Sequence, residues 1–338
     1  MPECESNNSE IIDNDYYDNI SFLKGLNIVD TKDIIYWYKL KSFIQIDAYN
    51  LTKLTINKAY NAIVLDKKME YRYFCFRYIE NIRTRKIHDM PTHSKFESVL
   101  IEFREYPHVE FIIRNAILKL PKNWCHSIVC GNLNYKLIKN ICDSISSNIR
   151  IIKYNRNNLT IGQYSTMLAS ADFWNNLNGE KILLYQDDTC IFKNNIMDFI
   201  NYDYDYDYIG APWIVKNNND IIVGNGGLSL RTKKIMLDVI NTVSIHNIVH
   251  DRQIRNSVIG SKIFVPPEDL YFTKVMSDYC IGKIADYDIA SKFSVEQCYE
   301  GDPFGGHCWW LVMKNDWKTL LYKYVVDAFC SDICVFRS

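Results

Sequence analysis

Short apolar runs alternate with stretches of helical periodicity between Phe96 and Tyr185, and this alternation limits the folds open to the chain more than any other feature. The runs and helical patterns follow one another at 99–101, 108–120, 127–130, 135–145, 150–154, 161–177 and 181–185. Short apolar runs are typical of strands buried on both faces, and an intervening helix lets consecutive strands pair in parallel. The pattern therefore predicts an α/β fold with a mostly parallel sheet flanked by helices. Such sheets bind ligands at the carboxyl ends of their strands.

The regions before this alternation have a different character. Residues 1–20 are polar and acidic, which predicts a disordered lead-in. Within 21–90, apolar residues recur at three- and four-residue steps, which predicts a helical N-terminal region, and no chemical motif stands out in it. The charged, proline-containing stretch at 83–95 is typical of a linker. The α/β domain is therefore expected to occupy 96–338.

Composition excludes several classes of function. The 39 basic and 40 acidic side chains give a net charge of -1, which argues against a dedicated nucleic-acid binder. No stretch approaches the ~18 consecutive apolar residues that a membrane span needs. The N-terminus lacks a signal-peptide pattern, and the 11 cysteines are scattered without a repeated spacing. We therefore expect a cytoplasmic protein with reduced thiols, neither secreted nor bound through a membrane span.

Two adjacent carboxylates follow the fourth apolar run, in the segment Gln186-Asp187-Asp188-Thr189. Adjacent carboxylates at the end of a buried strand repel one another and are costly to desolvate. A divalent cation would remove that cost, and Mg²⁺ or Mn²⁺ prefers oxygen ligands. A solvent-facing turn, in which Asp is common, explains the position equally well.

Two later segments are candidates for contacts with a ligand. Trp213 ends a Gly- and Pro-containing turn and would suit stacking against a sugar, although a buried Trp is an equally simple interpretation. Gly224, Asn225, Gly226 and Gly227 place three glycines in four positions, which permits close approach of the backbone to a ligand. A hairpin explains the same pattern. The segment lacks the Lys-Ser/Thr ending of a P-loop, so a phosphate cradle of that type is excluded.

Three titratable residues lie further along the chain. Glu268 and Asp269 follow two prolines at the start of a predicted helix. Acidic residues cap helices there by favourable interaction with the helix dipole, and a carboxylate in that place could also act as a general base. His307 lies in a glycine-rich loop among aromatic residues. It becomes a metal-ligand candidate only if folding brings it to the Asp pair.

In their order and spacing, these segments resemble a glycosyltransferase of the GT-A fold. The likeness is greatest to a glycosyltransferase-like domain family of uncharacterised proteins, several of them from large DNA viruses. It covers roughly Phe96 to Trp310 and rests on the segments 102–105, 173–174, 186–189, 208–213, 224–231, 267–269 and 305–307. The resemblance implies a GT-A-like, Rossmann-like sheet. A viral origin would place the protein in the host cytoplasm or the virion.

The resemblance also implies a metal site. GT-A enzymes hold a divalent metal through an Asp-x-Asp motif, of which the first position here is Gln186. By this likeness Asp188 would bind Mn²⁺ or Mg²⁺ directly, and Asp187 would contact the donor ribose or a metal-bound water. His307 matches the place of a histidine that often completes the metal shell.

Roles for the remaining segments follow from the same resemblance. Asp269 would be the catalytic base of an inverting reaction, with Glu268 as the second choice. Glu102 and Arg104 would meet the nucleoside at the end of the first strand. The glycine segment, with Asn225, Gly226 and Gly227, would lie against the donor sugar and acceptor, and Trp213 would stack on a sugar. The acidic residues of these segments predict a local acidic cleft that needs a cation before it can hold a phosphate.

The implied function is metal-dependent transfer of a sugar from a nucleotide-sugar donor, with a UDP-sugar favoured, to a hydroxyl of a glycan or protein acceptor. Two alternatives remain open. Gln186 in place of the first Asp favours a sugar-binding or scaffolding protein with a decayed active site. A metal-dependent nucleotidyltransferase also uses carboxylates at strand ends, but its usual phosphate loop, rich in Gly and containing Arg or Lys, is not evident.

Overall fold

The computed structural model describes residues 68–200, 205–213, 223–248, 265–310 and 317–326. The predicted disordered lead-in at 1–20 and the helical pattern at 21–67 lie outside the described residues. Residues 68–77, which belong to the predicted helical region at 21–90, form a helix.

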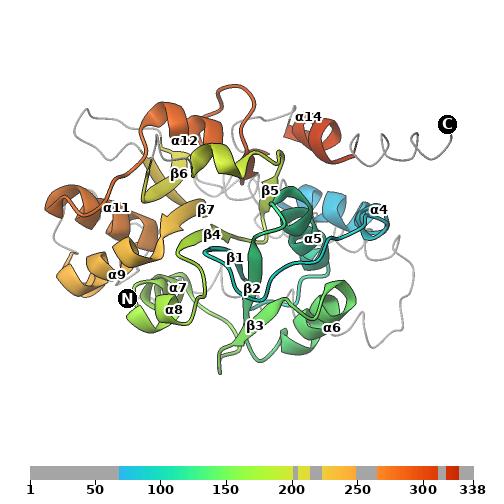
Figure 1. Ribbon diagram of the computed structural model, residues 1–338, viewed down its shortest axis with the longest axis horizontal. Helices are drawn as coiled ribbons and strands as arrows, with labels where there is room; N and C mark the ends of the chain where they lie inside the picture. Colours follow the sequence, from blue (N-terminus) through green and yellow to red (C-terminus); the bar gives the residue numbers. More distant parts are fainter. Residues whose placement is uncertain (1–67, 201–204, 214–222, 249–264, 311–316, 327–338) are drawn as a thin grey trace, which may run out of the picture.

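A six-stranded sheet forms the centre of the described structure, in the order β3–β2–β1–β4–β7–β6 (Figure 1). Its strands are β1 Phe96–Ile101, β2 Cys125–Cys130, β3 Arg150–Lys153, β4 Lys181–Tyr185, β6 Tyr208–Pro212 and β7 Val223–Thr232. Strands β1 to β4 pair in parallel, and β7 is antiparallel to both of its neighbours. The mostly parallel sheet expected from the sequence is therefore confirmed.

Helices cover both faces of this sheet. They are α4 Ile79–Arg83, α5 Val109–Lys119, α6 Tyr135–Ile145, α7 Ile161–Leu168, α8 Ala171–Asn175, α9 Lys233–Thr242, α11 Glu268–Tyr279, α12 Tyr287–Phe293 and α14 Trp317–Leu321. Short helical turns are η2 Ile196–Phe199, η3 Ile245–Asn247 and η4 Tyr322–Val326. Figure 1 shows α5 and α6 on one side of the sheet and α7, α8, α9 and α11 on the other.

The alternation of side chains along each strand explains the two-sided cover. In β4, Leu183 and Tyr185 join a hydrophobic cluster with α5 and α6, whereas Ile182 and Leu184 join a second cluster with α8, α9 and α11. Successive side chains of a strand point to opposite faces, so a strand that is apolar throughout needs a helix layer on each face. This is why these runs of the sequence are apolar at successive positions and do not alternate with polar residues.

Two local features differ from the sequence expectations. The helical pattern at 161–177 is two helices, because Ser170 accepts a hydrogen bond from the N–H of Phe173 and begins α8 as a new helix. The glycine-rich segment, expected to be a hairpin or a ligand-binding loop, lies within β7, whose first half pairs irregularly with β6 and whose second half, from Leu228 to Thr232, also pairs with β4. Its glycines therefore belong to the sheet.

A small second sheet places a distant histidine beside the Asp pair. It consists of β5 Thr189–Ile191, β9 Gly305–His307 and β8 Ser294–Val295, in the order β5–β9–β8. Strand β5 begins directly after Asp188, and its pairing with β9 sets Thr189 opposite His307. His307, expected in a loop, is the last residue of a strand. The register of this pair is what joins the two parts of the site.

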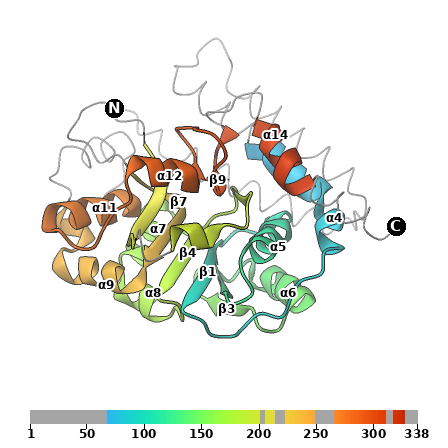
Figure 2. The same cartoon turned by 45° about the horizontal axis from the view of Figure 1, so that its top comes forward.

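The helix at 68–77 and α14 lie side by side against the edge of the second sheet (Figure 2). The ring of Tyr71 contacts those of Trp309 and Trp310 at centroid distances of 4.9 and 5.1 Å. Phe74 contacts Tyr322 at 6.0 Å.

Among the described residues, no helix combines the length and apolar character that crossing a membrane would need. The cysteines of this part of the chain are all free thiols.

Candidate active site

A cavity with a volume of about 470 Å³ opens where β1 and β4 end and β7 passes beside them. Volumes of this size are typical of small-molecule sites. Every site residue predicted from the sequence lines the cavity, with the exception of Trp213. Trp213 is half-buried and packs beside Gly224, and it is not among the described residues of the cavity wall. The position that the sheet rule predicted is therefore the position of the cavity.

Asp188 and His307 meet at one side of this cavity. The His307 Nε2 atom lies 3.1 Å from Asp188 Oδ1, and both side chains are largely buried. Asp188 Oδ1 has no partner with hydrogen-bond geometry among the described residues. The Sγ atom of Cys308 lies 3.2 Å from the other carboxylate oxygen, Oδ2. A buried carboxylate oxygen without a hydrogen bond, beside an imidazole nitrogen and a thiol, is a donor set that could hold a metal ion.

Glu296 fixes the orientation of this histidine. Its Oε2 atom lies 3.0 Å from His307 Nδ1, on the side of the ring away from Asp188. Carboxylates placed in this way hold metal-binding histidines in one tautomer and one ring orientation. The ring also lies against Gly227 so closely that a methyl group there would collide with it. Gly227 therefore makes room for His307.

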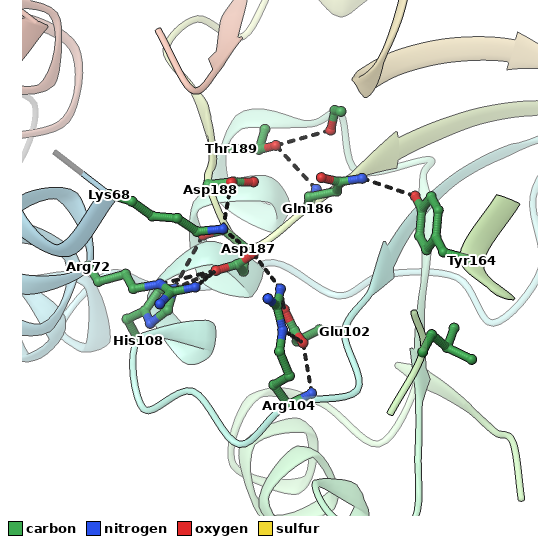
Figure 3. A network of polar contacts seen from close by, with 12 residues as sticks. Lys68, Arg72, Glu102, Arg104, His108, Tyr164, Gln186, Asp187, Asp188 and Thr189 are labelled. Carbon is green, nitrogen blue, oxygen red and sulfur yellow. Dashed lines mark hydrogen bonds and ion pairs between the residues drawn. The ribbon is translucent and has the colours of Figure 1, made fainter. Parts of the chain in front are cut away.

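Asp187 has a different environment from its neighbour in sequence. Arg72 contacts its Oδ2 atom at 2.8 Å, and Arg104 contacts Oδ1 at 3.0 Å. His108 Nε2 lies 3.5 Å from Oδ2. Burial alone would raise the pKa of Asp187, but Lys68, Arg72 and Arg104 hold it well below its usual value. The carboxylate of Asp187 is thus occupied by cations of the protein (Figure 3).

Glu102 and Arg104 form a bidentate ion pair at the end of β1. Arg104 donates from Nε and Nη2 at 2.8 and 2.9 Å, and its backbone N–H donates at 2.7 Å. Burial raises the pKa of Glu102, and Arg104 opposes this shift. The Arg104 guanidinium also lies over the ring of Tyr106, with Arg72 on the same ring. This cluster forms a rigid wall of the cavity next to the Asp pair.

The described cavity lining has an excess of acidic residues, as the sequence predicted, because Glu102, Asp187, Asp188, Glu268 and Asp269 line it together with two basic residues, Lys68 and Arg104. Each carboxylate of the motifs Glu102, Asp187, Asp188 and Glu268 is paired with a cation. These cations are Lys68, Arg72, Arg104 and Arg231. Lys68, Arg72 and Arg231 are all far in sequence from the carboxylates that they contact, so these ion pairs could not be predicted from local composition. Arg72 and Arg231 do not line the cavity, so the ion pairs reduce the acidic character of the site without removing the acidic excess of its lining.

Asp269 and Glu268 play unequal parts in the acid pair at the start of α11. Both oxygens of Glu268 accept from the Arg231 guanidinium, at 2.5 and 2.9 Å, and the pair is buried. Asp269 faces the cavity and accepts from the N–H groups of Gly226 at 3.2 Å and Leu270 at 2.8 Å. Burial, and then the charge of Glu268, raise the pKa of Asp269 to about 7. A carboxylate with this pKa is suited to take up a proton near neutral pH.

Gln186 and Asn225 complete the polar wall. The side-chain amide of Gln186 donates to the hydroxyl of Tyr164 at 3.1 Å. Its side chain is therefore engaged away from Asp188. The Oδ1 atom of Asn225 accepts from the N–H of Gly227 at 3.0 Å, which fixes β7 where it borders the cavity. A methyl group on Gly226 would collide with Glu268, so this glycine too is required by packing.

Four residues of the site escaped the sequence reasoning. Lys68 and Arg72 come from the N-terminal helix, in which no motif was found, and Glu296 follows β8. No local pattern marks any of these three, because their partners are distant in sequence. Cys308 is different, since it directly follows His307 and a thiol beside a candidate ligand could have been noted. Its φ of 49° is one of two positive values at described non-glycine residues.

Comparison with known proteins gives a remote likeness. A family described as a protein of unknown function (DUF5672) matches residues 148–307, which include the Asp pair, the glycine segment, the acid pair and His307. No curated protein matches the chain. The segment matched by the family is therefore the part of the chain that carries most of the predicted site.

Similar solved structures belong to two kinds of transferase. Mouse xyloside xylosyltransferase 1 and the galactosyltransferase LgtC, the latter in complex with donor and acceptor sugar analogs, are each 10% identical with a TM-score of 0.40. The match covers 63% of this chain in both cases, with 96% of the former and 86% of the latter. The 4-diphosphocytidyl-2C-methyl-D-erythritol synthase of Anaerococcus prevotii is 9% identical with a TM-score of 0.36, covering 57% of this chain and 86% of that one. Likeness at this level does not assign an activity.

Proposed function

We propose that the protein is a metal-dependent glycosyltransferase that moves a sugar from a nucleoside-diphosphate donor, with a UDP-sugar favoured, to a hydroxyl of a glycan or protein acceptor. One observation carries the proposal. A single cavity combines a donor set for a cation, Asp188 with His307, and a separate carboxylate, Asp269, whose pKa is about 7. Glycosyl transfer from such a donor needs both a positive charge at the leaving diphosphate and a base at the attacking hydroxyl.

The cation would be held by Asp188 and His307, with Cys308 as a further donor. The observations that fit a metal here are the buried Asp188 Oδ1 atom, which has no hydrogen bond and lies 3.1 Å from His307 Nε2, and the His307 orientation set by Glu296. The carboxylate of Asp188 suits Mn²⁺ or Mg²⁺, the ions expected from the resemblance, whereas an imidazole and a thiol suit Zn²⁺ better, so a metal titration must include all three ions. When bound, the ion supplies neutralisation of the charge that develops on the leaving diphosphate.

Asp269 would take the proton of the acceptor hydroxyl. As the acceptor oxygen bonds to the anomeric carbon, the bond from that carbon to the phosphate oxygen breaks, and its electron pair leaves with the nucleoside diphosphate. The hydrogen bond from the Gly226 N–H holds one Asp269 oxygen in place. Direct displacement by a base-activated hydroxyl inverts the anomeric configuration, so we propose an inverting reaction. Glu268, held by Arg231, would act only on the pKa of Asp269.

The nucleoside would lie against the wall formed by Glu102 and Arg104, and the donor sugar against Asn225 and the glycines beside it. Arg104 already has two carboxylate partners, so it is fixed in orientation before any ligand arrives. Asp187, through Arg72 and Arg104, serves to hold this wall together. Fixed groups of this kind lower the entropic cost of binding because they need no reordering.

Donor turnover tests the proposal. Purified protein is incubated with UDP-, GDP- and dTDP-sugars in Mn²⁺ or Mg²⁺, and release of nucleoside diphosphate is measured for the wild type, Asp188→Asn and Asp269→Asn. We expect metal-dependent release, lost by at least 100-fold in Asp269→Asn, as is typical when a general base is removed. Binding of nucleotide sugars without turnover would favour a decayed sugar-binding protein. In a parallel incubation with nucleoside triphosphates and a sugar phosphate, release of inorganic pyrophosphate would instead indicate a nucleotidyltransferase.

A further inference from the structure

The N-terminal helix at 68–77 contacts the Asp motif residue by residue. Tyr71 and Arg72 follow Lys68 by three and four residues, so the three side chains lie on one face of the helix. Each contacts one of the three successive residues 187–189, which follow β4. The pairs are Lys68 with Asp188 at 3.0 Å, Tyr71 with the carbonyl of Thr189 at 2.7 Å and Arg72 with Asp187 at 2.8 Å. Figure 3 shows Lys68 and Arg72 reaching the Asp pair from the same side.

The three contacts are of two kinds. Tyr71 and Arg72 are buried, at 0% and 3% exposure, and their rings and guanidinium pack against aromatic residues. They attach the helix to the motif. Lys68 lines the cavity instead, and 22% of its side chain remains exposed. The ammonium group is therefore the part of this helix that a ligand in the cavity can reach.

Lys68 lies beside the candidate metal site and does not occupy it. Its Nζ atom contacts Asp188 Oδ2, whereas the Oδ1 atom, which has no hydrogen bond, lies 3.1 Å from His307 Nε2. The Nζ atom is 3.9 Å from Asp187 Oδ1, beyond hydrogen-bond distance. An ammonium group has three donors, so an ion pair with Asp188 leaves donors for a second anionic partner.

We infer that Lys68 binds a phosphate oxygen of the donor's diphosphate, and that the N-terminal helix is thereby part of the catalytic centre. This inference rests on the proposed function. Lys68 is a compact point charge and can follow the phosphate as negative charge builds up, whereas Arg72 and Arg104 are fixed by Asp187. As the bond between sugar and phosphate oxygen breaks, the electron pair stays on that oxygen and Lys68 keeps its proton. The ammonium group stabilises the charge by hydrogen bonding.

Binding measurements separate this role from one in which Lys68 only tethers the helix. Titration calorimetry with UDP, uridine and inorganic pyrophosphate, in Mn²⁺ and in EDTA, is carried out on the wild type, Lys68→Gln and Lys68→Arg. Pyrophosphate is included because it has no nucleobase, so its binding reports the phosphate contacts alone. Lys318→Gln is the matched control, since Lys318 forms a 3.1 Å ion pair with Glu70 of the same helix, away from the cavity wall.

We expect Lys68→Gln to weaken the binding of UDP and pyrophosphate at least 10-fold, with uridine binding and the unfolding temperature unchanged. Lys68→Arg should retain binding within a few-fold, and Lys318→Gln should match the wild type. Equal affinity of Lys68→Gln and the wild type for both phosphate probes would overturn the inference and leave the proposed function standing. The inference would also be overturned if Lys68→Gln weakened uridine binding as much as UDP binding, because that result would show that Lys68 only tethers the N-terminal helix. If the wild type binds neither phosphate probe, the inference and the proposed function fail together.

Discussion

Replacement of Asp269 by Asn should stabilise the protein, and by an amount that grows with pH. The folded-state pKa of Asp269 is about 7, against an ordinary value of 3.8. A carboxyl group whose pKa is raised on folding holds its proton more tightly in the folded state. It therefore favours folding at low pH, and this contribution is lost as the pH rises from 3.8 towards 7. Asn carries no such charge and avoids the loss.

The two pKa values set the size of the effect. Relative to a neutral side chain, the ionised form of Asp269 costs about 4 kcal/mol at pH 8 and about 1.7 kcal/mol at pH 5. The advantage of Asn should thus increase by about 2.5 kcal/mol between these pH values. Asp269 is half-buried and borders the cavity, so screening by solvent makes this an upper value. The hydrogen bonds from Gly226 and Leu270 affect both pH values alike and cancel in the difference.

Urea unfolding of the wild type and Asp269→Asn at pH 5 and pH 8 measures this difference. Asp143→Asn is the control, because Asp143 is on the surface with 57% of its side chain exposed, and the exchange there should change by less than about 0.5 kcal/mol between the two pH values. The same raised pKa predicts that wild-type kcat/KM rises with pH, is half-maximal near pH 7 and levels off about one pH unit higher. If the advantage of Asn is the same at both pH values, the carboxyl group has no raised pKa. The assignment of Asp269 as the base would then lose its physical support.

Three further predictions concern the metal site and the buried ion pair. Gly227→Ala should abolish Mn²⁺ binding with little loss of folded protein, because the added methyl group displaces the His307 ring; unchanged affinity in a metal titration would contradict the ligand role of His307. Cys308→Ser should remove the thiolate-to-metal absorption band of the Co²⁺-loaded protein, and a wild-type spectrum without that band would exclude the thiol as a ligand. Arg231→Met should lower the free energy of unfolding by about 3–5 kcal/mol, because it leaves Glu268 buried without a partner. The added change Glu268→Gln should recover much of this loss. Urea unfolding of the wild type, the single variant and the double variant measures both effects.

The sequence by itself determined the layout of the sheet and the place of the site. Apolar runs and helical periodicity are local, and they were enough to define β1 to β4 and the helices between them. Glu102 and Asp188 then converge, because they follow the ends of β1 and β4, which lie along one edge of the sheet. His307 reaches the same cavity through the pairing of β9 with β5, and Asp269 through the start of α11, and the strand-end rule predicted neither of these. The expected strand-end position of the ligand site followed from topology alone.

Only the tertiary structure decided which member of each acidic pair is available for chemistry. Asp187 and Asp188 are adjacent in sequence, yet Arg72 and Arg104 occupy the first while Asp188 keeps an oxygen without a hydrogen bond. Glu268 and Asp269 divide in the same way, because Arg231 reaches only Glu268. The state of a buried carboxylate depends on charges within a few ångströms, and folding brings these from any part of the chain.

The N-terminal helix shows the same limit most clearly. Its sequence contains no recognisable motif, and yet Lys68 stands 3.0 Å from Asp188 across a separation of more than 100 residues. A lysine at a helical position is ordinary in sequence, and its meaning comes entirely from what the helix packs against. Local periodicity determines which segments are helices and strands. Long-range packing determines which charges meet, and therefore which residues can act.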